Sequence, residues 1–205
     1  PLVGHRLLRE DLRQVLDIAA KADVMAIGPG LGDVEGTLEA IREIIRQVTL
    51  PLVIDADAIK AVAADPKCIA GKRVVITPHS REFKVLTGKD LPAGADERAD
   101  PVREAGKTFG ATILLKGPVD IVSDGTRVKF NYTGNPGMTV GGTGDVLCGL
   151  VAGLVSKGMT PFDAARLGAF VNGYAGDLAF KEKSYGLTSM DVAENLGRVL
   201  AEFVS

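Results

Sequence analysis

The sequence predicts a three-layer α/β fold, in which a mostly parallel central sheet carries helices on both faces. Short, almost wholly apolar runs alternate with segments of helical periodicity, and this alternation is typical of parallel strands that are buried on both sides. The 205 residues contain no internal repeat, linker or low-complexity stretch. We therefore expect one domain over 1–205.

Each of the first two apolar runs is followed by a helix. Residues 24–27 lead into a glycine-rich turn at 28–32, and a helix is then expected. One face of that helix is marked by Ile41, Ile44, Ile45 and Val48. The second run, 51–55, precedes a short helix over about 58–64, for which Asp57 is the expected N-cap.

Two further runs complete the parallel part of the sheet, at 74–77 and 112–116. Between them the pattern predicts a helix over about 80–87 and a charged helix over about 96–109. Glycines follow both helices, with Gly88 as a stop and Gly110 placed to take a left-handed cap.

The last third of the chain has a different pattern. Residues 121–128 predict a hairpin with Asp124-Gly125 as its two-residue turn. Beyond a glycine-rich segment, helices are expected at roughly 145–156, 161–180 and 189–204. Two threonines that each precede an acid by three residues indicate helix starts, Thr160 and Thr188. Gly149 and Gly153 are four residues apart, and we expect them to allow close helix packing.

Charge and cysteine content exclude several classes of function. Lys plus Arg number 24 and Asp plus Glu number 26, a formal charge of -2. This balance argues against a nucleic-acid partner bound through phosphate neutralisation and against a polybasic membrane surface. Cys68 and Cys148 have no partner at metal-ligand spacing, so neither zinc nor a disulfide framework is expected. No apolar run reaches about 18 residues, and we expect a reducing, cytoplasmic location.

Glycine is the compositional outlier, and its clustering points to an anion site. The chain holds 25 glycines, about 12% against a typical 7%. In the segment from Gly134 to Asp145, glycines allow backbone N–H groups to converge on an anion at the start of the next helix. Asp145 there suits a base that takes a proton from a hydroxyl attacking a phosphoryl group. The alternative is a tight glycine turn with Asp145 as a helix N-cap.

The other glycine segments give weaker evidence for a phosphate or nucleotide site. The chain has no G-x-x-x-x-G-K-[ST] segment, which excludes a Walker-type phosphate loop. The turn at 28–32 lacks the last glycine of a dinucleotide fingerprint because Asp33 stands there. A plain strand-to-helix turn is the alternative.

Polar residues follow three more strands at the edge where open α/β sheets bind ligands. His79 is placed to contact a substrate or to cap a helix, and Lys116 to meet a phosphate or to lie in solvent. Asp55 and Asp57 are candidate Mg²⁺ ligands, although capping explains Asp57 as well. Together these strand ends predict one crevice along the sheet edge. His5, near the start of the chain, is expected to be structural.

Five motifs occur in order: GPGLG at 28–32, DADAI at 55–59, TPHSREF at 77–83, KGPVDIV at 116–122 and NPGMTVGGTGDVLCGLVAGL at 135–154. Together they resemble the NAD(P)H-hydrate dehydratase family of the ribokinase-like superfamily. The resemblance covers the chain from about Asp23 to Val204 and implies a ribokinase-like fold. It also implies that an adenine nucleotide phosphorylates the hydroxyl of hydrated NADH or NADPH, after which loss of phosphate restores the dihydronicotinamide.

The resemblance implies roles for individual residues. Asp145 would be the base, and Gly142 and Gly144 would act with it as catalytic residues of the anion hole. The hydrate would be contacted by Gly30, His79, Glu82 and Asp145. The nucleotide would be bordered by Lys116, Gly117, Pro118, Val119, Asp120, Asn135, Gly141, Gly142, Thr143 and Gly144.

The form GGTGD is more like the members that use ADP than those that use ATP, which usually carry Gln where Thr143 stands. We therefore expect ADP as the donor. Phosphoryl chemistry also predicts Mg²⁺, without naming its ligands. The resemblance further suggests a homo-oligomer.

Family members carry another strand-helix-strand portion before the GPGLG strand, but only about 22 residues precede Asp23 here. Since the first residue is Pro1, we expect the domain to lack its amino-terminal portion. Substrate recognition depends on that portion more than nucleotide binding does, and a fused epimerase domain is not represented.

Two other functions remain open. One is an ATP-dependent kinase of the same superfamily acting on a vitamin-precursor alcohol, hydroxymethylpyrimidine or hydroxyethylthiazole, which would release a stable phosphorylated alcohol. TPHSREF and NPGM argue against it. The other is a non-catalytic nucleotide-binding module, against which the presence of Asp145 argues, because binding alone does not require that acid.

Overall fold

The structure, a computed structural model, describes residues 7–203. Its six strands form one sheet in the order β1-β2-β3-β4-β5-β6. They span Met25–Ile27, Leu52–Ile54, Val74–Ile76, Thr112–Leu115, Asp120–Ser123 and Val128–Asn131. The first four are parallel, and β5 and β6 join as antiparallel neighbours. The predicted mostly parallel sheet is therefore confirmed.

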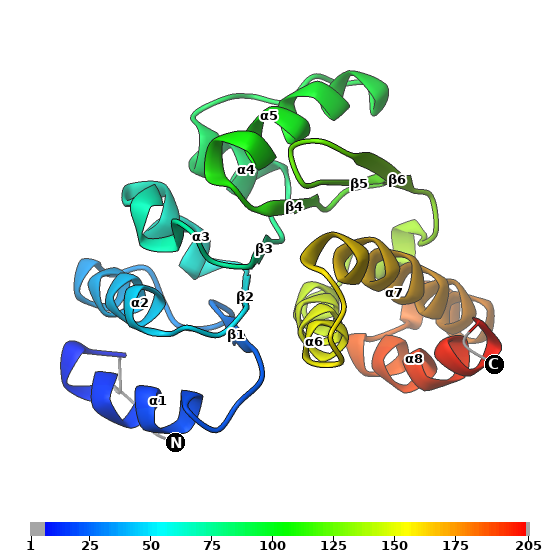
Figure 1. Cartoon of the computed structure of the whole chain (residues 1–205). Coiled ribbons are helices and arrows are strands. Elements are labelled where there is room, and N and C mark those ends of the chain that lie inside the picture. The colour runs from blue at the N-terminus through cyan, green and yellow to red at the C-terminus, as the bar shows by residue number, and fades with distance from the viewer. Residues whose placement is uncertain (1–6, 204–205) are drawn as a thin grey trace.

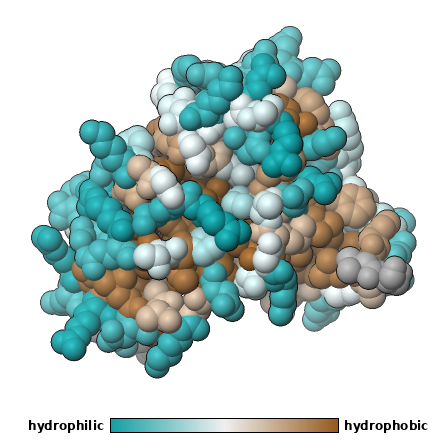
Figure 2. Space-filling view, in the orientation of Figure 1, coloured by the Kyte–Doolittle hydropathy of each residue, from teal (hydrophilic) through white to brown (hydrophobic). Residues whose placement is uncertain are grey.

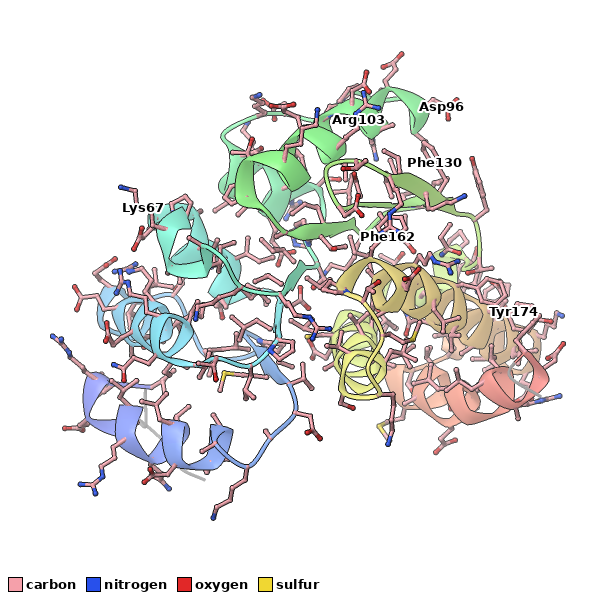
Figure 3. The ribbon with its side chains drawn as sticks, viewed as in Figure 1. Lys67, Asp96, Arg103, Phe130, Phe162 and Tyr174 are labelled. Atoms are coloured by element: carbon pink, nitrogen blue, oxygen red, sulfur yellow. The ribbon has the colours of Figure 1, made fainter. Side chains whose placement is uncertain are left out.

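Helices cover both faces of this sheet (Figure 1). One layer consists of α1 (Leu12–Ala19), α2 (Glu35–Gln47), α3 (Asp57–Ala64), α4 (Ser80–Thr87) and α5 (Ala99–Phe109). The other consists of α6 (Thr143–Ser156), α7 (Pro161–Lys183) and α8 (Ser189–Phe203). Lys67 and Asp96, in short 3-10 helices next to α3 and α5, lie with Arg103 of α5 at the outer rim of the first layer (Figure 3). Phe162, near the start of α7, packs in the core between this helix and the sheet.

The alternation of side chains along each strand builds two separate cores. Ile54 and Ile76 pack against the first helical layer. Val53 and Val75, on the opposite face, pack against α6 and α7. A third apolar cluster forms between α7 and α8, and Figure 2 shows apolar surface on this side of the molecule.

Most predicted boundaries are confirmed to within one or two residues. Gly88 and Gly110 both take the left-handed conformation after their helices, with φ of 72° and 58°. Thr160 caps α7, since its Oγ1 accepts a hydrogen bond from the Asp163 amide at 3.2 Å. Local signals of this kind depend on few neighbours, which is why the sequence predicts them well.

The predicted two-residue turn at Asp124-Gly125 is wrong. Ser123 pairs with Val128, so four residues connect the strands. Asp124 folds this loop by accepting hydrogen bonds from the amides of Thr126 and Arg127, at 3.0 and 2.8 Å. Gly125 serves packing, because a Cβ there would lie 2.8 Å from the Lys107 amide nitrogen of α5.

The expectation for Gly149 and Gly153 is also wrong. A Cβ at either position would meet nothing within 4 Å. The close approach of α6 and α7 is made by Gly168 instead, where a Cβ would lie 2.6 Å from a methyl carbon of Val151. The small residue that lets the two helices approach therefore lies on α7, not on α6.

Three remaining points concern the whole chain. No helix within 7–203 is long and apolar enough to cross a membrane. Cys68 and Cys148 are both free and buried. His5 lies outside the described residues.

Candidate active site

A cavity of about 750 Å³ opens beyond the carboxyl ends of β3 and β4. It is bounded by the loop that joins β6 to α6 and by the middle of α7. Its lining residues are His79, Lys116, Gly117, Pro118, Asp120, Thr133, Gly134, Asn135, Pro136, Met138, Thr139, Val140, Gly141, Thr143, Gly144, Leu147, Asn172 and Gly173. Of the four strand ends predicted to form one crevice, those of β3 and β4 meet here through His79 and Lys116, whereas the 28–32 turn and the Asp55-Asp57 segment are not among the lining residues.

The N-terminus of α6 forms one end of this cavity. Its N-cap is Gly142, with φ of +93°, and no side chain caps the helix. The first backbone N–H groups of α6 are thus without intrahelical partners, and they carry the positive end of the helix dipole. The Thr143 hydroxyl steadies the preceding loop by contacts to the carbonyls of Met138 and Val140, at 3.0 and 3.1 Å. This is the geometry of an anion site.

Lys116 stands beside that helix start. Its Nζ lies 2.7 Å from Asp55 Oδ1 and 3.8 Å from Glu82 Oε2. A Cβ placed on Gly144 would lie 3.4 Å from the same nitrogen. The Lys116 ammonium group is therefore close enough to touch a methyl group placed on Gly144. The Lys116 amide donates to the carbonyl of Pro78 at 2.8 Å, which continues the pairing of β3 and β4 to the cavity.

His79 is both a helix cap and a cavity residue. Its Nδ1 accepts hydrogen bonds from the amides of Arg81 and Glu82, at 3.1 and 3.2 Å. The Glu82 carboxylate in turn accepts from the His79 amide at 2.8 Å, which completes a capping box. In the neutral ring Nε2 is then the donor, and the side chain is half-exposed at the cavity edge.

The loop that walls the cavity is anchored on α7. Thr133 donates from Oγ1 to the Phe170 carbonyl at 3.0 Å. The Asp177 carboxylate accepts from the Gly134 amide at 3.0 Å and from Asn135 Nδ2 at 2.8 Å. A Cβ at Gly173 would lie 2.3 Å from Thr133 Oγ1. The glycine therefore lets the loop lie directly on the helix backbone.

Two polar side chains lie deep in the cavity wall. Asp120 accepts hydrogen bonds from the Gly117 amide and from Asn131 Nδ2, both at 3.0 Å. Burial raises the pKa of its carboxyl above the ordinary range. Asn172 is 7% exposed, and its Oδ1 has no hydrogen-bond partner among residues 7–203. A bound molecule with a hydrogen-bond donor would satisfy that oxygen.

Asp57 is not the N-cap of α3, contrary to expectation. The cap is Ala56, at φ 47° and ψ -123°, and Asp57 is the first helical residue. Its carboxylate instead accepts from the Gly32 amide at 2.9 Å, which ties the 28–32 turn to α3. A Cβ on Gly28 would lie 1.8 Å from the Asp55 carbonyl oxygen. The chain can approach so closely only because residue 28 is glycine.

A sequence model described as NAD(P)H-hydrate dehydratase matches residues 1–198. The chain belongs to the NAD(P)H-hydrate dehydratase family. The bifunctional NAD(P)H-hydrate repair enzyme Nnr of Pyrobaculum aerophilum is 47% identical over 205 residues, which are 99% of this chain and 40% of that protein. The ADP-dependent (S)-NAD(P)H-hydrate dehydratase of Cenarchaeum symbiosum is 37% identical over 99% of this chain and 71% of its own length.

Solved structures of this family have the same fold. The ADP/ATP-dependent NAD(P)H-hydrate dehydratase of Bacillus subtilis, co-crystallised with ATP/Mg²⁺, superposes with a TM-score of 0.77 at 29% identity. The alignment covers 91% of this chain and 69% of that one. A hydroxyethylthiazole kinase from Pyrococcus horikoshii reaches 0.75 at 24% identity, which shows a shared fold alone. The chain spans about two fifths of the bifunctional repair enzymes it matches.

Within this family fold, the structure brings most of the predicted nucleotide residues together. Those that line the cavity are Lys116, Gly117, Pro118, Asp120, Asn135, Gly141, Thr143 and Gly144, together with His79. Val119 and Gly142 lie between lining residues, and Glu82 reaches the site through Lys116 and His79. Gly30 lies in the turn after β1, away from the cavity lining. Asp145 is exposed on the first turn of α6.

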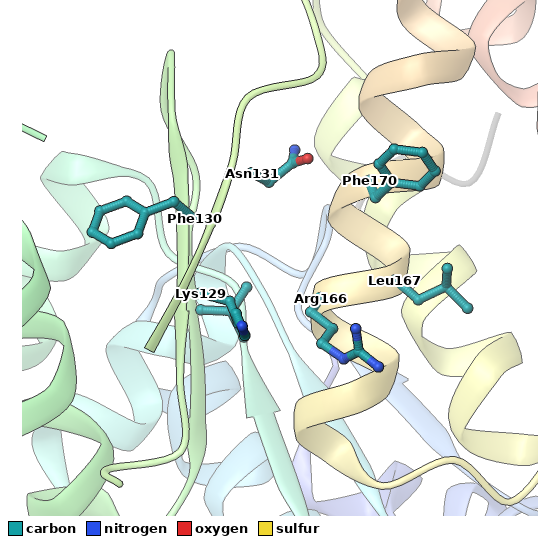
Figure 4. Close-up of a pocket in the computed structure, with 7 residues that line it drawn as sticks. Lys129, Phe130, Asn131, Arg166, Leu167 and Phe170 are labelled. Carbon is teal, nitrogen blue, oxygen red and sulfur yellow. The ribbon is translucent and has the colours of Figure 1, made fainter. Parts of the chain in front are cut away.

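Sequence reasoning missed the contribution of α7. Asn172 and Gly173, both on α7, line the cavity, yet neither belongs to a motif. The available signal was a lone amide within the small and apolar stretch of 167–173. A second, smaller cavity of about 270 Å³ lies between β6 and α7 (Figure 4).

Proposed function

We propose that this chain catalyses the ADP-driven dehydration of (S)-NAD(P)H hydrate to NAD(P)H. The observation that carries the proposal is the glycine-capped N-terminus of α6, with the Lys116 ammonium beside Gly144 and the Asp145 carboxylate on the same first turn. Family membership and the names of the relatives support the choice of substrate. A binding module would need no acid next to its anion hole.

The chemistry follows from these groups. Asp145 accepts the proton of the hydrate hydroxyl, whose oxygen then attacks the terminal phosphorus of ADP. The bond from that phosphorus to the bridging oxygen breaks, and AMP leaves. The N–H groups at Gly142 to Gly144 and the Lys116 ammonium stabilise the charge on the transferred phosphoryl group. Departure of phosphate from the ring carbon, with a proton lost from the neighbouring carbon, restores the double bond.

The two ligands would occupy different parts of the sheet edge. The nucleotide lies in the cavity between 116–120 and 135–144, with the unpartnered Asn172 as an added contact. Gly30, His79, Glu82 and Asp145 contact the hydrate. Thr143 within GGTGD and the ADP-dependent relatives support ADP as the donor.

Magnesium is proposed as part of the nucleotide complex. Residues 7–203 contain no group of three or more His, Cys, Asp or Glu side chains arranged to hold a metal ion. Mg²⁺ commonly binds through substrate phosphates with one or two carboxylates, so the phosphates would supply most of its ligands. When bound there it would neutralise phosphate charge.

We also propose that the chain forms a homo-oligomer. Phe170, Tyr174 and Phe203 form an aromatic cluster with ring centroids 5.1 to 5.9 Å apart, in which Phe203 meets the other two rings edge-on and is 51% exposed. An aromatic side chain that stays half-exposed at the edge of such a cluster favours a subunit contact. Sedimentation of the protein at several concentrations tests it, and a monomer throughout would contradict it.

The reaction is tested by mixing the protein with NADPH hydrate and Mg²⁺ and adding ADP or ATP in parallel. We expect the near-ultraviolet absorbance of NADPH to return with ADP, with one phosphate and one AMP formed per NADPH. Recovery with ATP alone would overturn the choice of donor. A stable phosphorylated alcohol formed from a vitamin precursor, without NADPH recovery, would favour the kinase. Nucleotide binding without any turnover would favour the binding module.

A further inference from the structure

Asp55 is a buried carboxylate next to the proposed phosphate site, where a negative charge requires an explanation. It follows β2 directly and is only 2% exposed. An isolated carboxylate at such a depth is strongly unfavourable, and it would repel a phosphate. Its partner is the Lys116 ammonium, 2.7 Å away. The two groups therefore form a buried ion pair.

This pair directs the ammonium group toward the anion hole. A lysine side chain is a flexible four-carbon stem with three N–H donors. Asp55 Oδ1 accepts a hydrogen bond from the Lys116 ammonium. The same ammonium nitrogen lies 3.4 Å from the position that a Cβ on Gly144 would occupy. The carboxylate oxygen Oδ2 is farther from that position, at 3.9 Å. The positive group thus faces the phosphate site and keeps donors free for a phosphate.

Asp55 itself is held by the backbone around it. Its amide donates to the Ile27 carbonyl at 3.1 Å, and its carbonyl accepts from the Ala58 amide at 3.2 Å. The next residue, Ala56, has φ 47° and ψ -123°, a conformation that side-chain-bearing residues rarely adopt. Strain of this kind persists only where the surrounding structure imposes it. The two backbone hydrogen bonds and the turn at Ala56 thus fix the backbone from which the Asp55 side chain extends.

We propose that Asp55 is a positioning residue, which holds the Lys116 ammonium beside Gly144 so that it meets the terminal phosphate of the bound nucleotide. The inference rests on the proposed nucleotide site. It assigns to Asp55 no contact with either substrate, and it predicts that Asp55 acts only while Lys116 is present.

The test is a double-variant cycle of nucleotide affinity, measured by titration calorimetry with ADP and with AMP, which lacks the terminal phosphate. The proteins are wild type, Asp55→Asn, Lys116→Met and the double variant. We expect Asp55→Asn and Lys116→Met each to weaken ADP binding by about tenfold or more, the range of a hydrogen bond to a charged group. AMP binding stays within about twofold. The double variant binds ADP as Lys116→Met does.

Asp90→Asn is the matched control, because Asp90 forms an exposed ion pair with Lys84 at 2.8 Å and should leave ADP affinity unchanged. Equal losses for ADP and AMP would indicate general damage and overturn the proposal. So would additive losses in the double variant, tighter ADP binding by Asp55→Asn, or a loss that requires Mg²⁺ and is independent of Lys116.

Should Asp55→Asn not fold, the comparison of Lys116→Met with the double variant decides, since the double variant leaves no unpaired charge buried. Equal ADP affinity supports the proposal, and unequal affinity contradicts it. Because binding is measured without turnover, a wild type that binds ADP but restores no NADPH contradicts only the proposed reaction. A wild type that binds no nucleotide contradicts both.

Discussion

Asp145, on the first turn of α6, is the proposed base, and a variant at this position tests catalysis separately from binding. Replacing Asp145 with Asn keeps the shape of the side chain and removes the proposed base. We expect turnover of NAD(P)H hydrate to fall by at least about a hundredfold, with ADP affinity unchanged, because the lost interaction belongs to the transition state.

Steady-state turnover and calorimetric ADP affinity check this prediction together. Asp100→Asn is the control, since Asp100 is also an exposed acid in the first turn of a helix, α5. Near-normal turnover by Asp145→Asn would refute its role as the base.

At Asn172 stability and affinity should change in opposite directions. A buried amide oxygen without a partner costs about 1–3 kcal/mol, so Asn172→Leu should keep or raise the melting temperature. The same variant should bind ADP up to about tenfold more weakly, because a nucleotide hydrogen bond is lost. Calorimetry and thermal unfolding on one preparation measure both effects. Asn195→Leu, on α8, serves as the control, and unchanged ADP affinity in Asn172→Leu would exclude the contact.

The residues of the candidate site were predictable from the sequence where they belong to a local motif. Gly141, Gly142 and Gly144, with the acid that follows them, need only their own spacing to indicate an anion hole. Lys116 was placed correctly because a strand end fixes the edge on which it emerges. Asn172 was not predictable, since its place in the cavity wall arises from the docking of 133–138 onto α7. That contact joins segments about forty residues apart, and no local pattern encodes it.

Among the elements, α3 begins with an unusual residue. Ala56 occupies a conformation that costs a residue with a side chain about 1–3 kcal/mol, while glycine adopts it freely at an entropic cost near 0.5–1 kcal/mol. We expect Ala56→Gly to raise the free energy of unfolding by about 1 kcal/mol, or the melting temperature by roughly 2–4 °C.

Calorimetric or circular-dichroism melting measures that change. Ala63→Gly, inside the same helix, should lower stability by about 1 kcal/mol, so the pair separates strain relief from the general cost of glycine. A loss of stability in Ala56→Gly would show that Ala56 is not strained.

The stability that Asp191 contributes at the start of α8 should depend on pH. Hydrogen bonds from Lys183 and from Thr188 lower the pKa of Asp191 from 3.8 to about 2. A carboxyl whose pKa is lower in the folded state stabilises the fold above its unfolded pKa, and this stabilisation is lost as the pH falls through about 2. Asp191→Asn should therefore melt below wild type at neutral pH, with the gap closing between about pH 4 and pH 2. A gap that is constant with pH would contradict the assignment.

Elements were predicted more accurately than the contacts that join them. Gly88 and Gly110 end their helices as expected because a left-handed cap depends on one residue. The Asp57 cap was wrong for a reason that lies elsewhere in the chain. Gly28 lies close against the Asp55 carbonyl, the backbone turns sharply at Ala56, and the helix therefore starts at Asp57, one residue earlier than its cap signal indicates.

At the scale of the whole molecule, the reactivity of the two buried cysteine thiols should report on global unfolding. Burial raises the pKa of Cys68 to about 11 and that of Cys148 to about 12. Because the thiolate is the reactive form, neither should react with a disulfide reagent near pH 8 in the native state, whereas both should react in denaturant. ADP should slow the residual native reaction by mass action. Rapid native labelling, assigned with Cys68→Ser and Cys148→Ser, would show a local opening instead.

The anchoring of the 131–138 loop on α7 has a kinetic consequence. The hydrogen bonds that hold this wall of the cavity are all made within the chain: Thr133 donates to the Phe170 carbonyl, and the Gly134 amide and the Asn135 side chain donate to the Asp177 carboxylate. The conformational entropy of the loop is then lost once, during folding, and a nucleotide need not order it again. Association with ADP should consequently follow a single exponential whose rate rises linearly with ADP concentration, as for a docking surface that is rigid before the encounter.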